Sequence, residues 1–233
     1  MIRAAALGLM LLSCAGPLAA QAYQCRVPAT APLQEVRPDG PIRTAPVTGY
    51  VMALSWSPEF CKPRLEQRSH ARQCSRRAGR FGFVLHGLWP QSARGWPQWC
   101  PTSARPTGAQ LAGQLCRSPS ARLVARQWAK HGACMARTPR TYFRVSNILF
   151  DSLRWPDLDR LSRKEALTAG DLREVFVAAN RGWRKEAVGI VSNERGWLEE
   201  VRLCYDRRFR PTACDAQRFG PSDDAALNIW RGL

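Results

Sequence analysis

The chain has 233 residues, a formal net charge of +17 at pH 7 and an isoelectric point near 10.5. This length fits one domain that can bury a proper core, and no apolar run approaches the roughly 20 residues of a transmembrane helix. The positive charge comes almost entirely from arginine, whose guanidinium binds phosphate oxygens in pairs, so a nucleic acid is the first partner to consider. Genome composition and solubility are the alternative explanation of this charge.

Residues 1–22 have the pattern of an export signal, with a basic start, an apolar run over 4–12 and small residues after it. A small-x-small cleavage site ending at Ala22 would leave Tyr23 as the first residue. The alternative is a lipoprotein signal with attachment at Cys14. In both cases we expect an exported protein, periplasmic or secreted.

Beyond Cys14 the chain contains an even set of eight cysteines. In an exported chain such a set is typical of four disulfides. A zinc site is the weaker interpretation, because there is no Cys-x-x-Cys and no two histidines have ligand spacing. We therefore expect no metal and no cofactor. The cysteines are Cys25, Cys61, Cys74, Cys100, Cys116, Cys134, Cys204 and Cys214.

The first part of the chain predicts an arm and two strands. Residues 23–47 are rich in Pro, Ala and Arg without periodicity, which indicates an extended N-terminal arm before a domain over 48–233. Residues 51–56 predict a short strand, and 81–85 predict a second strand that ends at His86. The segment between these strands is basic and predicts a loop region over 61–80.

The middle of the chain predicts helices. Residues 89–119 are rich in Pro, Gly and Trp and predict irregular structure. Helical composition follows over 121–132 and again over 141–153. Thr168-x-x-Asp171 resembles a capping box and opens a helix that runs to about Asn180.

Near the C-terminal end, residues 187–191 and 197–205 alternate in polarity, which predicts two paired strands. Strands early and late in the chain, with helices between them, are typical of an α+β fold. We expect a central antiparallel sheet with several packed helices, in one disulfide-reinforced domain.

Two of the three histidines lie in unusual aromatic and glycine-containing segments, Phe83–Pro90 and Gln127–Cys134. Histidine exchanges a proton near neutral pH, because its ordinary pKa is about 6.5. Each histidine alone could be a core residue, but a pair suggests an acid and a base. On the predicted helix, Trp128 points into the core beside Val124. The opposite face carries Leu123, Gln127, Lys130, His131 and Cys134.

The chemistry of these segments suits a phosphodiester. Lys130 lowers the pKa of the adjacent His131 and can stabilise a developing dianion. After His86, we expect Gly87 to permit close approach of a substrate and Trp89 to offer a flat surface for a base. With the 2′-hydroxyl of RNA as nucleophile, one histidine removes its proton and the other protonates the leaving 5′-oxygen. This reaction needs no metal.

The segments His86-Gly-Leu-Trp-Pro90 and Trp128-x-Lys130-His131-Gly-x-Cys134 resemble the two active-site segments of the ribonuclease T2 family. The resemblance extends from about Met52 to Cys214. It implies an endoribonuclease that cleaves single-stranded RNA through 2′,3′-cyclic phosphates without a metal. Further agreement comes from Trp56–Cys61, Tyr142–Phe143 and Val201–Asp206.

The resemblance also implies the roles of the site residues. His131 would be the general base, His86 the general acid and Lys130 the stabiliser of the transition state; the reverse assignment of the histidines is the alternative. Trp89 would stack on a base. The implied disulfides are Cys61–Cys74, Cys100–Cys134 and Cys204–Cys214, which leaves Cys25 with Cys116.

Three positions depart from the family pattern. Gln127 stands where a glutamate is usual and Arg126 where a histidine is frequent, while Gln91 replaces an acidic residue that some relatives use for base selection. Gln127 can still bind a phosphate oxygen, but it cannot tune a neighbouring pKa as a carboxylate does. We expect Gln127 to act with the catalytic residues, and Trp89, Gln91, Leu123 and Arg126 to contact substrate.

These departures leave the base preference and the pH optimum open. The expected partner is single-stranded RNA, bound by a monomer without an obligate protein partner. The alternative function is an inactive or low-turnover relative that only binds RNA or another polyanion. An effector that attacks neighbouring cells is a third hypothesis, although no delivery domain is evident in the sequence.

Overall fold

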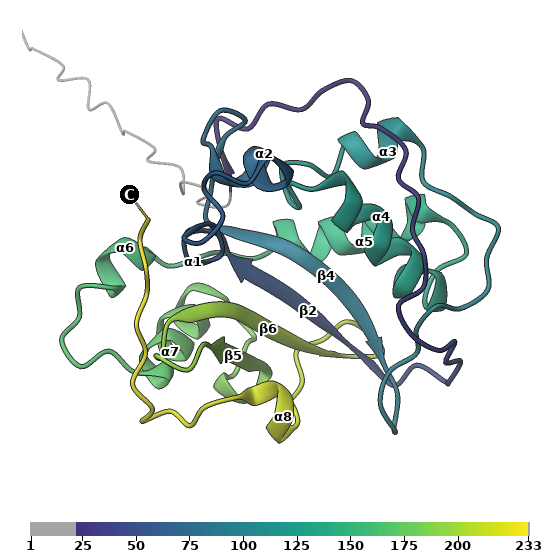
Figure 1. The fold of residues 1–233 in the computed structure, drawn as a ribbon. Helices are drawn as coiled ribbons and strands as arrows, with labels where there is room; N and C mark the ends of the chain where they lie inside the picture. Colours follow the sequence, from purple (N-terminus) through teal and green to yellow (C-terminus); the bar gives the residue numbers. More distant parts are fainter. Residues whose placement is uncertain (1–21, 233) are drawn as a thin grey trace, which may run out of the picture.

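The computed structural model describes residues 22–232 (Figure 1). Residues 1–21 of the predicted export signal, with the alternative attachment site Cys14, therefore lie outside the described residues. No helix of the described part is long and apolar enough to cross a membrane. At the start of this part, the short strand β1 (Ala22–Tyr23) pairs with β3 (Arg80–Phe81).

A four-stranded antiparallel sheet forms the centre of the molecule, in the order β4-β2-β6-β5 (Figure 1). The predicted α+β class and the four strands are confirmed, including the pairing of the last two. The prediction that the second strand ends at His86 is wrong, because β4 continues to Gln91 along its neighbour β2. The strands are β2 (Gly49–Trp56), β4 (Phe83–Gln91), β5 (Val188–Ser192) and β6 (Leu198–Asp206).

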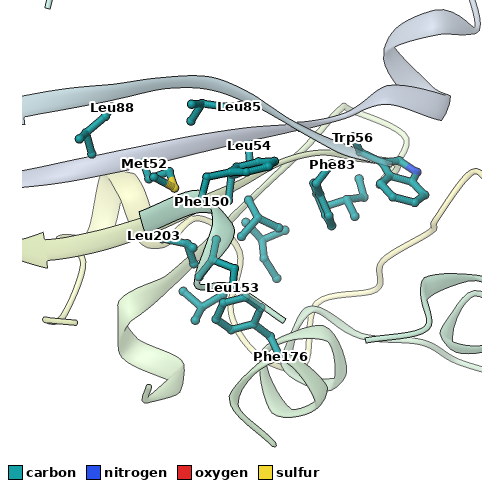
Figure 2. Packing of buried hydrophobic residues seen from close by; sticks show 14 of the residues in the cluster. Met52, Leu54, Trp56, Phe83, Leu85, Leu88, Phe150, Leu153, Phe176 and Leu203 are labelled. Atoms are coloured by element: carbon teal, nitrogen blue, oxygen red, sulfur yellow. The ribbon is translucent and has the colours of Figure 1, made fainter. Parts of the chain in front are cut away.

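A β-bulge interrupts the pairing of β4 with β2 at His86. Leu85 and Gly87 pair with consecutive residues of β2, and His86 between them pairs with none. Strict alternation would place residues three apart on opposite faces of a sheet. Because one residue is inserted, Leu85 and Leu88 both point into the core, as Figure 2 shows.

The three predicted helices are confirmed as α4, α5 and α7, and the capping box of Thr168 and Asp171 is present. Short helices also occur in segments that were predicted to be irregular. Of these, α3 has its own capping box of Thr107 and Gln110. The helices are α1 (Ser57–Cys61), α2 (Ala71–Cys74), α3 (Gly108–Ala112), α4 (Ala121–Lys130), α5 (Pro139–Asp151), α6 (Leu158–Leu161), α7 (Ala169–Ala179) and α8 (Ala216–Phe219), with turns η1 (Arg68–His70), η2 (Gly132–Cys134) and η3 (Lys185–Ala187).

One apolar core lies between the sheet and the helices α3, α4, α5 and α7 (Figure 2). Trp128 of α4 is 1% exposed and lies in this core with Val124, as predicted. Phe150 of α5 and Phe176 of α7 reach the same cluster from other helices. Because α4 packs beside β4, it brings the second histidine segment next to the first.

Four disulfides reinforce the fold: three are the pairs that the resemblance implies, and the fourth joins the two cysteines that were left. Cys100–Cys134 joins the segment before α3 to η2, directly after His131. Residues 24–48 contain no named helix or strand, and within them Arg43 forms a bridge with Gln98. The disulfides are Cys25–Cys116, Cys61–Cys74, Cys100–Cys134 and Cys204–Cys214.

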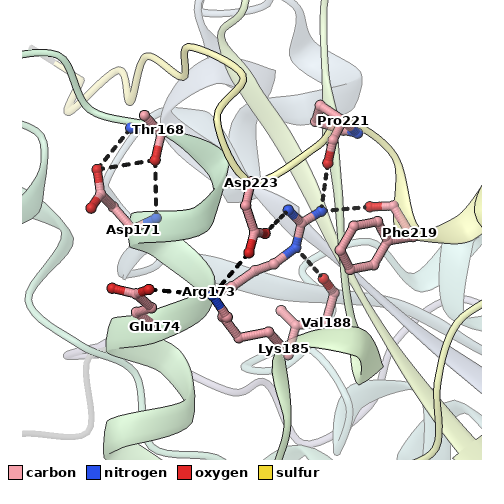
Figure 3. Close-up of polar contacts among 9 residues, drawn as sticks. All are labelled: Thr168, Asp171, Arg173, Glu174, Lys185, Val188, Phe219, Pro221 and Asp223. Atoms are coloured by element: carbon pink, nitrogen blue, oxygen red, sulfur yellow. Dashed lines mark hydrogen bonds and ion pairs between the residues drawn. The ribbon is translucent and has the colours of Figure 1, made fainter.

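A buried arginine attaches the C-terminal segment to the domain (Figure 3). The side chain of Arg173 in α7 is 0% exposed, and its Nη1 forms an ion pair with Asp223 at 2.7 Å. Its other nitrogens donate to the carbonyl oxygens of Val188, Phe219 and Pro221. A buried charge is tolerated when it is paired and hydrogen-bonded, and here each guanidinium nitrogen has a partner. These bonds join α7, β5, the end of α8 and the segment after it.

We expect Arg173→Met to lower the free energy of unfolding by about 3–5 kcal/mol, because it leaves buried carbonyl oxygens without donors. Chemical denaturation of the oxidised protein measures this loss. The control is Arg144→Met, which changes an exposed arginine of α5 and should shift the value by less than about 0.5 kcal/mol. Equal losses in both variants would contradict the structural role of Arg173.

Candidate active site

His86 is held by a carboxylate from the third strand of the sheet. Its Nδ1 lies 2.8 Å from Oε2 of Glu200 in β6. Burial opposes the ionisation of Glu200, but the hydrogen bonds from His86 and Arg202 outweigh it and keep the pKa of this carboxyl below its ordinary value. A charged Glu200 that accepts from Nδ1–H leaves Nε2 of His86 free for another partner.

His86 and Glu200 come from strands that are not neighbours, and β2 lies between them. Ser55 of β2 pairs with Glu200, and Ala53 pairs with Gly87. We attribute the contact between His86 and Glu200 to these short side chains, which leave space above the central strand on the face opposite the core.

His131 lies just beyond the end of α4. The helix ends at Lys130, two residues before its predicted end, and His131 is the C-cap, with its N–H donating to the carbonyl oxygen of Gln127 at 3.0 Å. The side chain is buried, and Nδ1 has no hydrogen-bond partner. Burial, followed by repulsion from Lys130 and His86, lowers the pKa of His131 to about 3. This imidazole is therefore neutral near pH 7, and the predicted direction of the Lys130 effect is confirmed.

Trp89 contacts the rings of both histidines. Its ring centroid is 5.1 Å from that of His86, nearly perpendicular to it, and 5.6 Å from that of His131. The indole N–H donates to Oε1 of Gln127 at 2.7 Å. Gln127 is itself buried, so its carbonyl oxygen orients Trp89.

Gly87 does not leave an open approach for substrate, which corrects the expectation from the sequence. A Cβ at this position would lie 2.1 Å from Oε1 of Gln127 and 2.5 Å from Nε1 of Trp89. The space beside Gly87 is thus already filled by the hydrogen-bonded pair of Gln127 and Trp89. A glycine is required here for packing of the site, because any side chain would collide with that pair.

The two cations of α4 converge on an acidic residue of the N-terminal arm. Asp39 accepts a hydrogen bond from Arg126 and lies 3.2 Å from Nζ of Lys130. The bond from Arg126, together with the charge of Lys130, lowers the pKa of Asp39 to about 2. Both cations also lie over the ring of Trp99, within 6 Å of its centroid. The carboxylate of Asp39 therefore already binds the two cations that could bind phosphate oxygens beside His131.

A cavity of about 710 Å³ opens beside His86 and Trp89 on the face opposite the core. At the end of β4, Gln91 accepts from Arg218 and donates to the carbonyl oxygen of Trp89 at 3.1 Å. Arg218 belongs to α8, directly before the segment that Arg173 attaches to the domain.

The structure brings most of the predicted site residues together, but it does not bring Leu123 to the histidines. Leu123 lies in the first turn of α4, where its N–H donates to Oγ of Ser120, and His131 follows the other end of that helix. The residues grouped around Trp89 and Asp39 are His86, Gln91, Arg126, Gln127, Lys130 and His131.

Three residues of the site were missed by the sequence analysis: Asp39, Glu200 and Arg218. Alternation along the last predicted strand could have placed Glu200 and Arg202 on its polar face. The nearby sequence gives no sign that this face lies next to His86. Asp39 and Arg218 lie in segments without periodicity. Within residues 22–232, no group of three or more His, Cys, Asp and Glu side chains could hold a metal ion.

The pattern of the ribonuclease T2 family matches residues 47–214. A "Probable ribonuclease" of Haemophilus influenzae is 33% identical over 188 residues, which are 74% of this chain and 63% of that protein. Ribonuclease I of Escherichia coli is 25% identical over 196 residues, 66% of this chain and 73% of that protein. A "Ribonuclease" of Aeromonas hydrophila is 41% identical over 100 residues, 43% of each chain. The matches thus span about three fifths of the Haemophilus protein and less than half of the Aeromonas one.

Solved structures show the same fold at lower identity. RNase NT, solved with 5′-AMP, has a TM-score of 0.61 at 20% identity, covering 79% of this chain and 98% of that one. An RNase-related protein from Calystegia sepium has a TM-score of 0.62 at 19% identity with the same coverage. The family pattern covers well over half of the chain and contains both histidine segments. The chain therefore belongs to the ribonuclease T2 family.

Proposed function

We propose that the protein is an exported, metal-independent endoribonuclease that cleaves single-stranded RNA through 2′,3′-cyclic phosphates. The observation that carries this proposal is that two histidines contact the same indole ring, one beside the carboxylate of Glu200 and the other beside the ammonium of Lys130. The names of the relatives, all ribonucleases, support it. Four disulfides support export to an oxidising compartment, periplasmic or extracellular.

In this proposal His131 is the general base. A neutral imidazole can accept the proton of the 2′-hydroxyl, and its lowered pKa keeps it unprotonated before substrate binds. A bound phosphate offsets the repulsion from Lys130, which strengthens the base when it is needed. Lys130 then stabilises the negative charge that develops on the phosphorane.

His86 is the general acid. Glu200 accepts from Nδ1 and stabilises the charge of the protonated ring, so that Nε2 can donate to the leaving 5′-oxygen. Trp89 supplies a flat face for a base, held in place by Gln127. Gln127 thus positions Trp89. A glutamine can do this because its amide oxygen accepts the indole N–H without needing the charge of a carboxylate.

Arg126, Gln91 and Leu123 remain proposed substrate contacts. Arg126 lies beside Lys130 and suits a phosphate, and Gln91 together with Arg218 lies at the end of β4 beyond Trp89. Leu123 would contact RNA only along the outer part of α4. We propose that the protein acts as a monomer.

We expect His86→Ala and His131→Ala each to lower kcat/KM on single-stranded RNA by about 10²–10⁴-fold, the contribution of general acid–base catalysis. Wild-type activity should persist in excess EDTA and yield 2′,3′-cyclic phosphate ends. His70→Ala is the control, because this third histidine lies in η1 outside the site. Loss of wild-type activity in EDTA would refute the mechanism, and RNA binding without turnover would favour the inactive relative.

The pH dependence of kcat/KM should show an acidic limb far below pH 6.5. Protonation of His131 removes the base, so activity falls as the pH falls through its pKa of about 3. Lys130→Met removes a repulsive charge and should move this limb to higher pH while it lowers kcat. A wild-type limb near pH 6.5 would contradict a buried, neutral base.

Asp39→Asn should lower KM for RNA by up to about fivefold at low salt, the effect expected of a surface ion pair. It frees Lys130 and Arg126 from a carboxylate that competes with phosphate. Steady-state kinetics at several salt concentrations measure the change, which salt should diminish. Glu35→Gln is the matched control, since Glu35 lies in the same arm and pairs with Arg37. An increase in KM for Asp39→Asn would show that Asp39 orders the cations for substrate.

A further inference from the structure

A second cavity adjoins the cavity beside His86, and α1 contributes to the walls of both. The second cavity measures about 570 Å³. Glu59 and Phe60 of α1 line the cavity beside His86, whereas Pro58 lines the second one. Lys62, directly after α1, belongs to both walls. A long ligand that fills the cavity beside His86 can therefore continue past Lys62 into the second cavity.

The wall of the second cavity is entirely cationic in its charged residues. Among the described residues that line it, none is an Asp or Glu, whereas the cavity beside His86 has glutamates as well as cations in its wall. The charged residues of the second cavity are Lys62, Arg76, Arg80 and Arg231. Of these four, only Arg231 forms an ion pair with a described carboxylate, at 3.6 Å from Asp159. Cations that lack acidic partners and line one cavity attract a polyanion.

The segments that carry these cations are joined to one another. The disulfide Cys61–Cys74 ties the end of α1 to α2, and both cysteines line the second cavity. The C-terminal segment runs back from α8 toward α1 (Figure 1), where the carbonyl oxygen of Trp230 accepts from Nε1 of Trp56 at 2.6 Å. Nζ of Lys62 lies 4.5 Å from the ring centroid of the same Trp230. Because the wall is held in this way, a bound anion has little further ordering to offset.

Arg76 has a backbone conformation that is costly for an arginine. Its φ of 62° lies in the left-handed region, directly after Ser75, the C-cap of α2. Glycine or asparagine is the usual residue at such a position. Strained residues persist chiefly where the side chain has a function, and the side chain of Arg76 lines the second cavity. The backbone of Arg76 therefore supports a binding role for this cavity.

We propose that the second cavity binds backbone phosphates of the RNA chain on the 3′ side of the cleaved bond. This inference rests on the proposed function, in which His86 protonates the leaving 5′-oxygen and so faces the 3′ part of the chain. Beyond His86 that part of the chain meets Lys62 and then the arginines of the second cavity. Arginine binds phosphate oxygens in pairs, and contacts to phosphates carry no base preference. The cavity therefore favours long RNA over short RNA, whatever its sequence.

The first test uses wild-type protein and 2′-deoxy oligonucleotides that contain one ribonucleotide, so that each is cleaved at a single bond. In one series the 3′ part is lengthened one nucleotide at a time, and in the other the 5′ part. We expect kcat/KM at low salt to rise by about fivefold or more along the 3′ series and then to level off, because each phosphate contact adds binding. Equal rates along the 3′ series, or an equal or larger rise along the 5′ series, would overturn the proposal.

The second test uses the double variant Arg76→Asn/Arg80→Gln. Asparagine tolerates the left-handed backbone of position 76, and Arg80 is exposed in β3, so the variant should fold. Relative to the shortest substrate, it should lose the gain that the 3′ part provides. For the longest substrate, the slope of log kcat/KM against log salt should become shallower by about 0.7 for each phosphate contact that is lost.

Arg140→Gln/Arg144→Gln is the matched control, because it removes the same charge from exposed positions of α5 that do not line the second cavity. This control should keep the wild-type dependence on 3′ length. An equal loss in both double variants would mean that only the net charge matters, and it would overturn the proposal.

A binding measurement separates this inference from the proposed function. Oligonucleotides made only of 2′-deoxynucleotides lack the nucleophile, and fluorescence anisotropy compares their affinities at increasing length. A gain with length that Arg76→Asn/Arg80→Gln loses, without cleavage of any RNA, would support the phosphate site and refute the proposed function. Cleavage whose rate does not depend on 3′ length, with binding that the variant leaves unchanged, would refute the phosphate site alone.

Anionic vesicles test the other class of ligand that a cationic cavity suits. Leu65, which lines the second cavity, is 50% exposed, and an apolar side chain beside cations also fits a lipid headgroup. RNA is favoured because Lys62 joins this cavity to the one beside His86. In sedimentation with phosphatidylglycerol vesicles, we expect Arg76→Asn/Arg80→Gln to bind as well as the α5 control. Weaker vesicle binding than the control, with an unchanged dependence on RNA length, would overturn the proposal.

Discussion

The extra residue in the pairing of β4 with β2 is the constraint on which the site depends. It places His86 and Gly87 on the face opposite the core while Leu85 and Leu88 both remain buried. One insertion therefore serves stability and chemistry together. It keeps the apolar residues of the edge strand β4 directed into the core. It also lets the imidazole of His86 extend over β2 to Glu200.

The two histidines differ because the fold gives them opposite surroundings. His131 is enclosed at a helix end with cations beside it, which favours the neutral ring. His86 is partly exposed, and its Nδ1 contacts the buried carboxylate of Glu200. Pairs of titratable groups in contrasting environments are the usual way in which a protein assigns an acid and a base. Trp89 contacts both rings and so links the two histidines.

The elements with strong local patterns could be predicted from the sequence, and the contacts between distant segments could not. Apolar periodicity located the main strands and helices, and the Thr168 capping box located the start of α7. The short α3 was missed although its capping box of Thr107 and Gln110 is visible in the sequence. The predicted end of β4 was wrong because the bulge at His86 breaks the alternation of polarity that identifies a strand. Glu200 lies 114 residues from His86, and only the sheet order brings them together.

The disulfide Cys100–Cys134 has a consequence for where the protein can work. It fixes the turn that follows His131, and in the described chain no other disulfide has a cysteine as close to this histidine in sequence. In a reducing compartment that turn is held by weaker bonds, so the buried side chain of His131 is less firmly enclosed. Formation of this disulfide thus completes the site. An exported ribonuclease, as proposed above, would thus have a fully closed site only where disulfides form, away from the RNA of the cell that makes it.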